Sequence, residues 1–522
     1  MPRWRDNWPL LVALGLLWVM LAATLVESLR VNHGHLVYSL DDAYIHMALA
    51  KHLAGDGVWG ITRYAFSSSQ SSLLWPLLLA LVYLPLGPSV VVPLVLNMLF
   101  ASLLVGAVYL LGRRAGLPPL LNLVLLLELV AFMPMNMMAF DGMEHLLQSL
   151  VSLVFVYLAV EALAAPAASR RQVVALLALM PVVTATRYEG LFLAAVVAPL
   201  FLLRRRWALA FGLPVMALLP VGAYGLVSLA HGNHFLPNSL LMKSNLLLGW
   251  GAKPTPWDQF VDSPLKYVVL PALALYAYRL RGRGFWQAGQ LWLLVFLGVF
   301  ALQATLAMLS RRYEAYLLTI GLYALGSALL AELQRTKLSA RAQALLPAAL
   351  MGALCVLPPG QLGVESLALA PIYTTNIYQQ QYQMGKFLRQ YYQGQGVAVN
   401  DVGAVDYYAD IKLLDLWGLG SVEVVNARRR QAYGPGAIRW LARTKDIRVA
   451  FTYPEWFANF GGLPEEWLLV GIWKLPVNLV CGGGEVYIYA VDPAEAGRLH
   501  RCLVEYGPQL PPQVQQVLVV YR

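Results

Sequence analysis

Charged residues are scarce in this sequence. Asp, Glu, Lys and Arg together make up 13% of its 522 residues, about half of the ~25% that is usual in soluble domains. Hydrophobic residues make up 59%. This composition excludes a disordered or collagen-like chain and a protein that coats nucleic acid, and it argues against a soluble enzyme.

Several patterns that indicate particular chemistry are also absent. We find no internal repeat and no low-complexity tract. No spacing of His, Cys or carboxylate residues predicts a metal site, and the sequence has neither a glycine-rich phosphate loop nor a nucleotide-sugar motif. We therefore expect neither a metal nor a cofactor.

The net charge of +10 would by itself suggest a polyanionic partner, but its distribution indicates otherwise. Residues 360–522 carry 14 basic and 14 acidic side chains, so the whole excess lies in residues 1–359, with 24 basic and 14 acidic. The positive charge accompanies the apolar part of the chain. We therefore expect a lipid bilayer, and not nucleic acid, as a partner.

Apolar runs near the ~20 residues that cross a hydrocarbon core recur through the first 360 positions. The first run is too long, and too poor in small residues at its end, for a removable signal peptide. The fold class that this predicts is a multi-pass α-helical membrane protein. Eleven spans are predicted, at residues 9–29, 89–112, 118–136, 144–166, 172–187, 190–203, 207–230, 266–280, 286–309, 313–332 and 342–358.

The basic residues predict the orientation of these spans, because short cytosolic loops retain Lys and Arg. With eleven spans, the N-terminus is expected in the cytoplasm and residues 360–522 outside. The apolar helix 72–86 must then lie in the outer interface or re-enter the membrane. Fifteen basic residues lie at alternate span ends: Arg3, Arg5, Arg113, Arg114, Arg170, Arg171, Arg204, Arg205, Arg206, Arg279, Arg281, Arg283, Arg335, Lys337 and Arg341.

The spans 172–187 and 190–203 are short for complete crossings and meet at Arg187, Tyr188 and Glu189. A charged pair at a broken helical hairpin in the membrane is costly and usually faces a cavity lined by protein or water. We expect Arg187 and Glu189 to shape such a cavity by pairing with each other or with the first outer loop.

Residues 360–522 differ in character from the rest and predict a small α/β domain outside the membrane. Two of the three cysteines, Cys481 and Cys502, lie in this domain, where a disulfide is permitted. A bridge and two reduced, buried thiols explain these cysteines equally well. The expected strands are 396–400, 412–416, 447–453 and 485–491, with helices at 378–392 and 421–432.

The first outer loop, residues 30–71, contains two adjacent carboxylates. Ser39 is the expected N-cap of an amphipathic helix lying on the outer membrane surface, which ends at one of the glycines that follow. Asp41 and Asp42 lie in its first turn, where the helix dipole favours their ionised forms, and Asp42 faces His46 one turn on. Capping explains the pair if it stands alone, but other outer segments carry polar groups as well.

Nine basic residues remain on the outer side, against the topological bias. A lipid phosphate can satisfy such charges, and snorkelling to the headgroups is the alternative. Glu144 and His145 open another span, where an acid and an imidazole can bind a sugar hydroxyl or place a proton. The nine are Arg30, Lys51, Arg63, Arg187, Lys243, Lys253, Lys266, Arg311 and Arg312.

Taken in order, these segments resemble motifs of the GT-C class of integral-membrane glycosyltransferases that use polyprenyl-phosphate sugars. The first-loop segments resemble the signature of bacterial members related to arabinofuranosyltransferases and are similar, more distantly, to aminoarabinose transferases and protein O-mannosyltransferases. Tyr188 stands where this family has Pro, and His145 where Thr is more usual, which leaves the donor sugar open. The similar segments are Asp41–Ile45 with Ser71–Trp75, Gly142–Glu144, Arg187–Gly190, Leu236–Asn238 with Lys243, Asn400–Ala404 and Leu414–Leu419.

The resemblance implies a GT-C-like catalytic domain, residues 1–359, followed by the extracytoplasmic α/β domain, residues 360–522. The enzyme would move one sugar from a polyprenyl-phosphate donor to a hydroxyl of a cell-envelope glycan, lipid or protein, with inversion. Asp41 is the expected general base and Asp42 its helper. Lys243, Arg311 and Arg312 are expected to hold the phosphate, whose charge grows in the transition state. The remaining expected substrate-binding residues are His46, Glu144, His145, Arg187, Glu189 and Asn238.

Two alternatives stay open at this point. One is transfer of the sugar to Ser or Thr of a protein, with the α/β domain binding that acceptor. The other is a flippase or transporter of a lipid-linked sugar, which also has broken helices and intramembrane charges but more often shows paired halves near the midplane. In each case the expected location is the bacterial inner membrane, with a cytoplasmic N-terminus and a periplasmic or extracellular α/β domain.

Overall fold

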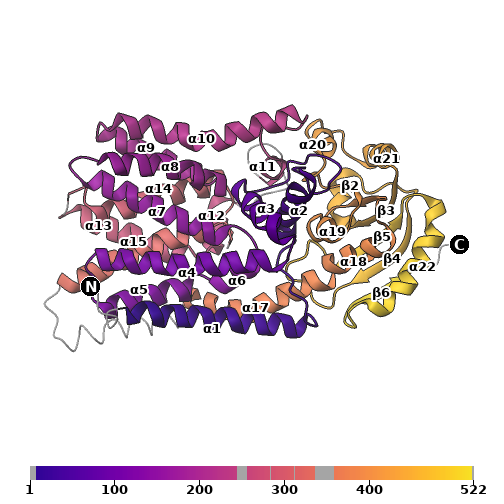
Figure 1. Ribbon diagram of the computed structural model, residues 1–522, viewed down its shortest axis with the longest axis horizontal. Coiled ribbons are helices and arrows are strands. Elements are labelled where there is room, and N and C mark those ends of the chain that lie inside the picture. The colour runs from indigo at the N-terminus through magenta and orange to yellow at the C-terminus, as the bar shows by residue number, and fades with distance from the viewer. Residues whose placement is uncertain (1–6, 244–254, 283, 311, 336–357, 520–522) are drawn as a thin grey trace.

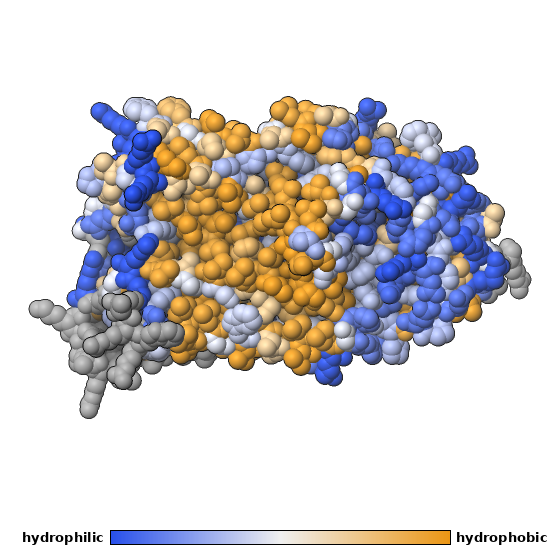
Figure 2. All heavy atoms as spheres, in the orientation of Figure 1, coloured by the Kyte–Doolittle hydropathy of each residue, from blue (hydrophilic) through white to orange (hydrophobic). Residues whose placement is uncertain are grey.

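The computed structural model describes residues 7–243, 255–282, 284–310, 312–335 and 358–519. It has a bundle of helices with a mixed sheet at one end (Figure 1). On the face that Figure 2 shows, apolar residues cover the middle of the helical bundle, with hydrophilic residues toward both ends of the molecule. Within the described residues, six helices are long and apolar enough to cross a membrane, or seven if one bent pair counts as a span. The predicted fold class is confirmed.

The bundle follows the predicted spans closely. Ten of the eleven spans fall on its helices, and residues 342–357 of the eleventh lie outside the described residues. The bundle helices are α1 (Trp8–Val31), α4 (Val91–Arg114), α5 (Pro119–Phe132), α6 (Met135–Phe140), α7 (His145–Ala164), α8 (Arg170–Thr186), α9 (Gly190–Leu203), α10 (Trp207–Ala230), α11 (Asn238–Lys243), α12 (Pro256–Asp262), α13 (Lys266–Leu280), α14 (Ala288–Leu306), α15 (Ala315–Arg335) and α17 (Pro358–Gln379).

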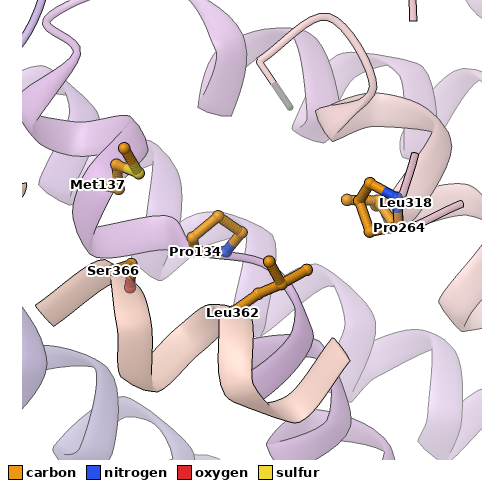
Figure 3. A pocket seen from close by; sticks show the side chains of 6 residues that line it. All are labelled: Pro134, Met137, Pro264, Leu318, Leu362 and Ser366. Carbon is orange, nitrogen blue, oxygen red and sulfur yellow. The ribbon is translucent and has the colours of Figure 1, made fainter. Parts of the chain in front are cut away.

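The predicted span 118–136 is not continuous. It divides into α5 and α6 at Met133, whose backbone is extended (φ −92°, ψ 115°) because a residue before proline is disfavoured in the helical region. A small pocket lies beside this break, lined by Pro134, Pro264 and Leu362 among others (Figure 3). Its volume of about 10 Å³ is room for a single water molecule at most, so it cannot be a substrate site.

The structure adds one long helix that hydropathy did not predict. α17 packs along α1 and α5 and leads into the sheet (Figure 1). Polar residues interrupt its apolar run: the Ser366 hydroxyl donates to Asn136 Oδ1 at 2.7 Å, and Asn32 Nδ2 donates to the Thr374 hydroxyl at 3.0 Å. The predicted division at residue 360 therefore falls at the start of a bundle helix, and the first strand begins only at Gly396.

The first outer loop folds differently from the prediction in two respects. Its helices are α2 (Asp42–Asp56) and α3 (Leu74–Leu86). Ser39 is not the N-cap: Asp41 occupies that position, and the Ser39 hydroxyl instead donates to Asp141 Oδ1 at 2.6 Å. α2 is also not an exposed amphipathic helix. Residues 43–50 are all buried, because α3 and a helix of the C-terminal domain cover α2.

The C-terminal domain is a six-stranded sheet with the strand order β2-β1-β3-β5-β4-β6. β1 (Gly396–Val399) pairs in parallel with β2 (Lys412–Asp415) and β3 (Ile447–Thr452), and the remaining pairings are antiparallel. β4 (Leu468–Lys474) and β6 (Gln515–Leu518) were not predicted, and β5 is Glu485–Ala490. The helices are α18 (Gln381–Tyr391), α19 (Gly403–Tyr408), α20 (Val422–Arg429), α21 (Pro435–Thr444) and α22 (Ala496–Tyr506).

Cys481 and Cys502 are both buried and free, so the structure selects two thiols over a disulfide. Those basic residues assigned to one membrane side that the structure describes lie at helix ends away from the sheet. Arg113 donates to Asn7 at the start of α1, and Arg204 donates to the Leu163 carbonyl at the end of α7. The first and last described helices and strands, α1 at its start and β6, therefore lie toward opposite ends of the molecule (Figure 1).

Candidate functional site

Four separate parts of the chain meet at the sheet end of the bundle: the start of α2, the start of α7, the α8–α9 break and the loop before α15. Gly142 precedes α7 with a positive φ of 68°, and a Cβ there would lie 2.6 Å from the ring of Tyr38. Only glycine fits this turn without strain, and the turn places Glu144 and His145 inside the site.

Asp42 and Arg312 form the accessible part of the site. Arg312 Nη2 lies 2.8 Å from Asp42 Oδ2, and the two side chains are 24% and 22% exposed, respectively. The guanidinium of Arg312 also lies 5.0 Å from the ring centre of Tyr313. This pair offers an incoming ligand one carboxylate and one cation that are already oriented.

Glu144, Arg187 and Glu189 form a buried ion cluster behind that pair. Arg187 Nη1 donates to Glu144 at 2.7 Å, while Nη2 and Nε donate to the two oxygens of Glu189 at 2.8 and 3.1 Å. Arg187 is 4% exposed and Glu144 is fully buried. The α8–α9 break thus supplies the predicted Arg187–Glu189 pair, and Arg187 pairs in addition with Glu144 at the start of α7.

Two histidines lie beside this cluster. His46 Nε2 is 3.1 Å from the Ser71 hydroxyl and 3.9 Å from Glu144 Oε2. The ring of His145 is fully buried next to Tyr313, and neither of its nitrogens forms a hydrogen bond within the described part of the chain. Together these side chains give the site polar groups on the bundle side of the Asp42–Arg312 pair.

Asp41 faces away from this site, toward the C-terminal domain. Its two carboxyl oxygens accept the main-chain N–H groups of Gly403 at 2.6 Å and Ala404 at 2.7 Å. Burial, and then the neighbouring Asp401 charge, hold the pKa of Asp41 well above its usual range, since two neighbouring carboxylates repel each other.

Seven of the eleven predicted site residues come together. The other four do not: Asp41 turns to the C-terminal domain, and Asn238 donates from its amide to the Leu419 carbonyl at 3.1 Å. Arg311 lies outside the described residues, as does the side chain of Lys243. The seven are Asp42, His46, Glu144, His145, Arg187, Glu189 and Arg312.

Sequence reasoning missed Tyr313 and Asp401 as site residues. Both guanidinium groups, of Arg187 and Arg312, lie about 5 Å from the Tyr313 ring, at 4.9 and 5.0 Å, where an aromatic face stabilises a cation. The position of Tyr313 directly after Arg312 in the sequence was the feature that could have indicated its place in the site. Asp401 was part of a recognised motif, but only the fold brings it to Asp41. Among the described residues, no group of three or more His, Cys, Asp and Glu residues is placed to hold a metal ion.

Comparison with known proteins defines the fold. The structure is similar over 92% of its length to ArnT from Cupriavidus metallidurans bound to undecaprenyl phosphate, with a TM-score of 0.56, 16% identity and coverage of 99% of that chain. It is similar over 93% of its length to the apo state of the same protein, with a TM-score of 0.55, 15% identity and the same coverage of that chain. The predicted GT-C-like fold is therefore confirmed.

Residues 375–489 also match a family described as a domain of unknown function, DUF8728. No curated protein matches the chain. The match to DUF8728 covers α18, the first five strands and the helices between them, which is the part of the C-terminal domain that touches Asp41.

Proposed function

We propose that the protein is a membrane glycosyltransferase that moves a single sugar from a polyprenyl phosphate to an acceptor hydroxyl at the sheet end of the bundle. The observation that carries this is the partly exposed Asp42–Arg312 pair, set against a buried ion cluster in a fold similar to ArnT. The ArnT structure holds undecaprenyl phosphate. A polyprenyl-phosphate donor is therefore the substrate class that this fold supports best.

In this proposal Arg312 holds the phosphate of the donor. The acceptor oxygen attacks the anomeric carbon, the bond from that carbon to the phosphate oxygen breaks, and the phosphate gains negative charge as it leaves. A guanidinium placed at that phosphate stabilises the developing charge and can bind two of its oxygens at once. Arg187 is not assigned this role, because its guanidinium is already engaged by two carboxylates.

We assign the general base to Asp42 rather than to Asp41. Asp42 is partly exposed, whereas both oxygens of Asp41 accept main-chain N–H groups and its raised pKa favours a protonated form. A carboxylate is a weak base, but it needs to accept the proton only late, as the attacking oxygen becomes acidic. The proton of the acceptor hydroxyl thus passes to Asp42.

The proposal includes the predicted location. The end of the bundle that carries the arginine-rich loops would face the cytoplasm, so the site and the C-terminal domain would face the periplasm or cell exterior. A cell-envelope glycan, lipid or protein would supply the acceptor hydroxyl, and inversion of the anomeric centre is expected for a single displacement.

The test is mass spectrometry of lipid that co-purifies with the protein, joined to glycan analysis of a strain that lacks it. We expect a polyprenyl phosphate in the purified sample and loss of one sugar from the envelope. Complementation with the wild-type chain should restore that sugar, and complementation with Asp42→Asn should not. Bulk phospholipid alone together with an unchanged set of envelope glycans would refute the proposal.

A further inference from the structure

Asp41 links the first outer loop to the C-terminal domain, because both of its carboxyl oxygens accept hydrogen bonds from main-chain N–H groups of that domain. One oxygen accepts the N–H of Gly403 and the other the N–H of Ala404. Asp41 is also the residue directly before Asp42, at the N-cap of α2. Because the peptide bond between them is planar, fixing the side chain and backbone of Asp41 restricts the direction in which Asp42 can point.

The domain surface is fitted closely to this residue. A Cβ added to Gly403 would lie 2.0 Å from the main-chain oxygen of Asp41, a contact that no larger residue can make without moving the backbone. The absence of a side chain at Gly403 therefore allows the domain to approach the loop. The distance is set by backbone atoms on both sides, so it cannot be relieved by a change of rotamer.

Asp401 completes the contact from the same domain. Its Oδ2 accepts the side-chain N–H of Gln381 at 2.7 Å and lies 3.2 Å from the Tyr453 hydroxyl. Burial raises the pKa of Asp401 as well as that of Asp41. Because two negative charges side by side would repel, we expect the two neighbouring carboxyl groups to hold one proton between them.

Two further contacts attach the domain to the first loop beyond Asp41. Lys51, on α2, donates to the Tyr407 carbonyl at 2.9 Å, and Arg63 lies 2.5 Å from Asp410. Lys51 is nine residues beyond Asp42, which is about 14 Å along a helix. The domain thus holds α2 at two well-separated points, so its position defines the direction of the helix as well as the position of its first residue.

We infer that the C-terminal domain completes the catalytic centre: the amides of Gly403 and Ala404, together with Asp401, fix Asp41, and Asp41 orients Asp42 toward the acceptor. Asp41 is then a positioning residue. This inference rests on the proposed function and gives a role to the part of the chain that matches DUF8728.

The first test compares Gly403→Ala with Gly436→Ala. Both add one methyl group to the same domain, but a Cβ at Gly436 meets nothing within 4 Å. We expect Gly403→Ala to lower kcat by about 10²-fold, since a displacement of about 1 Å costs this much in catalysis, while KM for the donor is unchanged. Gly436→Ala should match the wild type. Equal kcat in both variants would overturn the inference.

The second test separates positioning from folding. Asp401→Asn keeps a group that can donate to Asp41, so it should retain most of the activity at neutral pH, whereas Asp401→Ala should lose it. Thermal unfolding of both variants shows whether the protein is folded. Equal kcat for Asp401→Ala and the wild type would overturn the inference.

The pH profile adds a readout that a merely structural role would not change. As the pH rises through the raised pKa of the Asp41–Asp401 pair, the second carboxyl ionises and kcat of the wild type should fall. Asp401→Asn should lack this alkaline fall, because an amide has no proton to lose there. The other titratable groups facing the pair are Asp42, Tyr44, Tyr453 and Cys481. An alkaline limb unchanged in Asp401→Asn would contradict the shared proton.

These outcomes are distinguishable from failure of the proposed function. If the wild-type protein transfers no sugar, the function itself is wrong. If it transfers sugar and the Gly403 and Asp401 variants behave as the wild type, only the inference is wrong.

Discussion

Replacing the two arginines of the site by methionine should affect the protein in opposite ways. Arg187 is 4% exposed and neutralises Glu144 and Glu189, which are 0% and 14% exposed. Its removal leaves two buried carboxylates without a counter-charge, which costs about 3–5 kcal/mol of folding stability. Arg312 and Asp42 are each partly exposed, so after Arg312→Met water hydrates Asp42 and the loss is about 0–1 kcal/mol.

The assay is thermal unfolding of both variants in the same detergent, followed by donor kinetics on each variant that folds. Arg187→Met should unfold at a clearly lower temperature than the wild type. Arg312→Met should unfold close to the wild type and show weak donor binding. Adding Glu144→Gln and Glu189→Gln to Arg187→Met should restore part of the lost stability, because neutral amides need no counter-charge. Equal unfolding temperatures for the two arginine variants would refute the assignment of a structural role to Arg187 and a donor-binding role to Arg312.

Three further predictions follow from single positions. Asp42→Asn should lower kcat by about 10²–10⁴-fold in a transfer assay, while Asp56→Asn on the same helix should not, and equal rates would remove Asp42 from the role of base. Burial raises the pKa of Asp415 to about 6 from 3.8, so between these pH values the folded state binds more protons than the unfolded state. Unfolding titrations should therefore show that the free energy of unfolding falls as the pH rises from about 4 to 6, and that it falls less in Asp415→Asn. Gly142→Ala should lower the unfolding temperature more than Gly116→Ala, because both positions have a positive φ but only Gly142 adds a clash; equal shifts would contradict the tight packing at Gly142.

The sequence predicted the membrane bundle well, because apolar length and the placement of arginines are local properties. α17 escaped prediction for the same reason. Its apolar face is interrupted by Ser366, Thr374 and Asn376, which form hydrogen bonds with Asn136, Asn32 and the Val477 carbonyl on other segments. Hydropathy counts these residues as polar wherever they lie. A helix that belongs to the bundle through its hydrogen bonds therefore looks like part of the outer domain.

The sequence predicted most of the residues that form the candidate site, but it could not distinguish the role of Asp41 from that of Asp42. Asp41 and Asp42 are adjacent and chemically identical, so nothing local distinguishes them. The difference arises from partners far along the chain: Arg312 pairs with Asp42, while Gly403 and Ala404 hold Asp41. The burial of α2 was missed for the same reason, because the domain that covers α2 follows it by more than 340 residues.

The most direct test of the central claim measures a polyprenyl-phosphate sugar in membrane lipid before and after incubation with purified protein and a cell-envelope extract. We expect the wild type to consume one such lipid and to release an equal amount of polyprenyl phosphate, and Asp42→Asn to do neither. A wild type that consumes no polyprenyl-phosphate sugar, or an Asp42→Asn variant that consumes it equally fast, would contradict the proposed transferase activity.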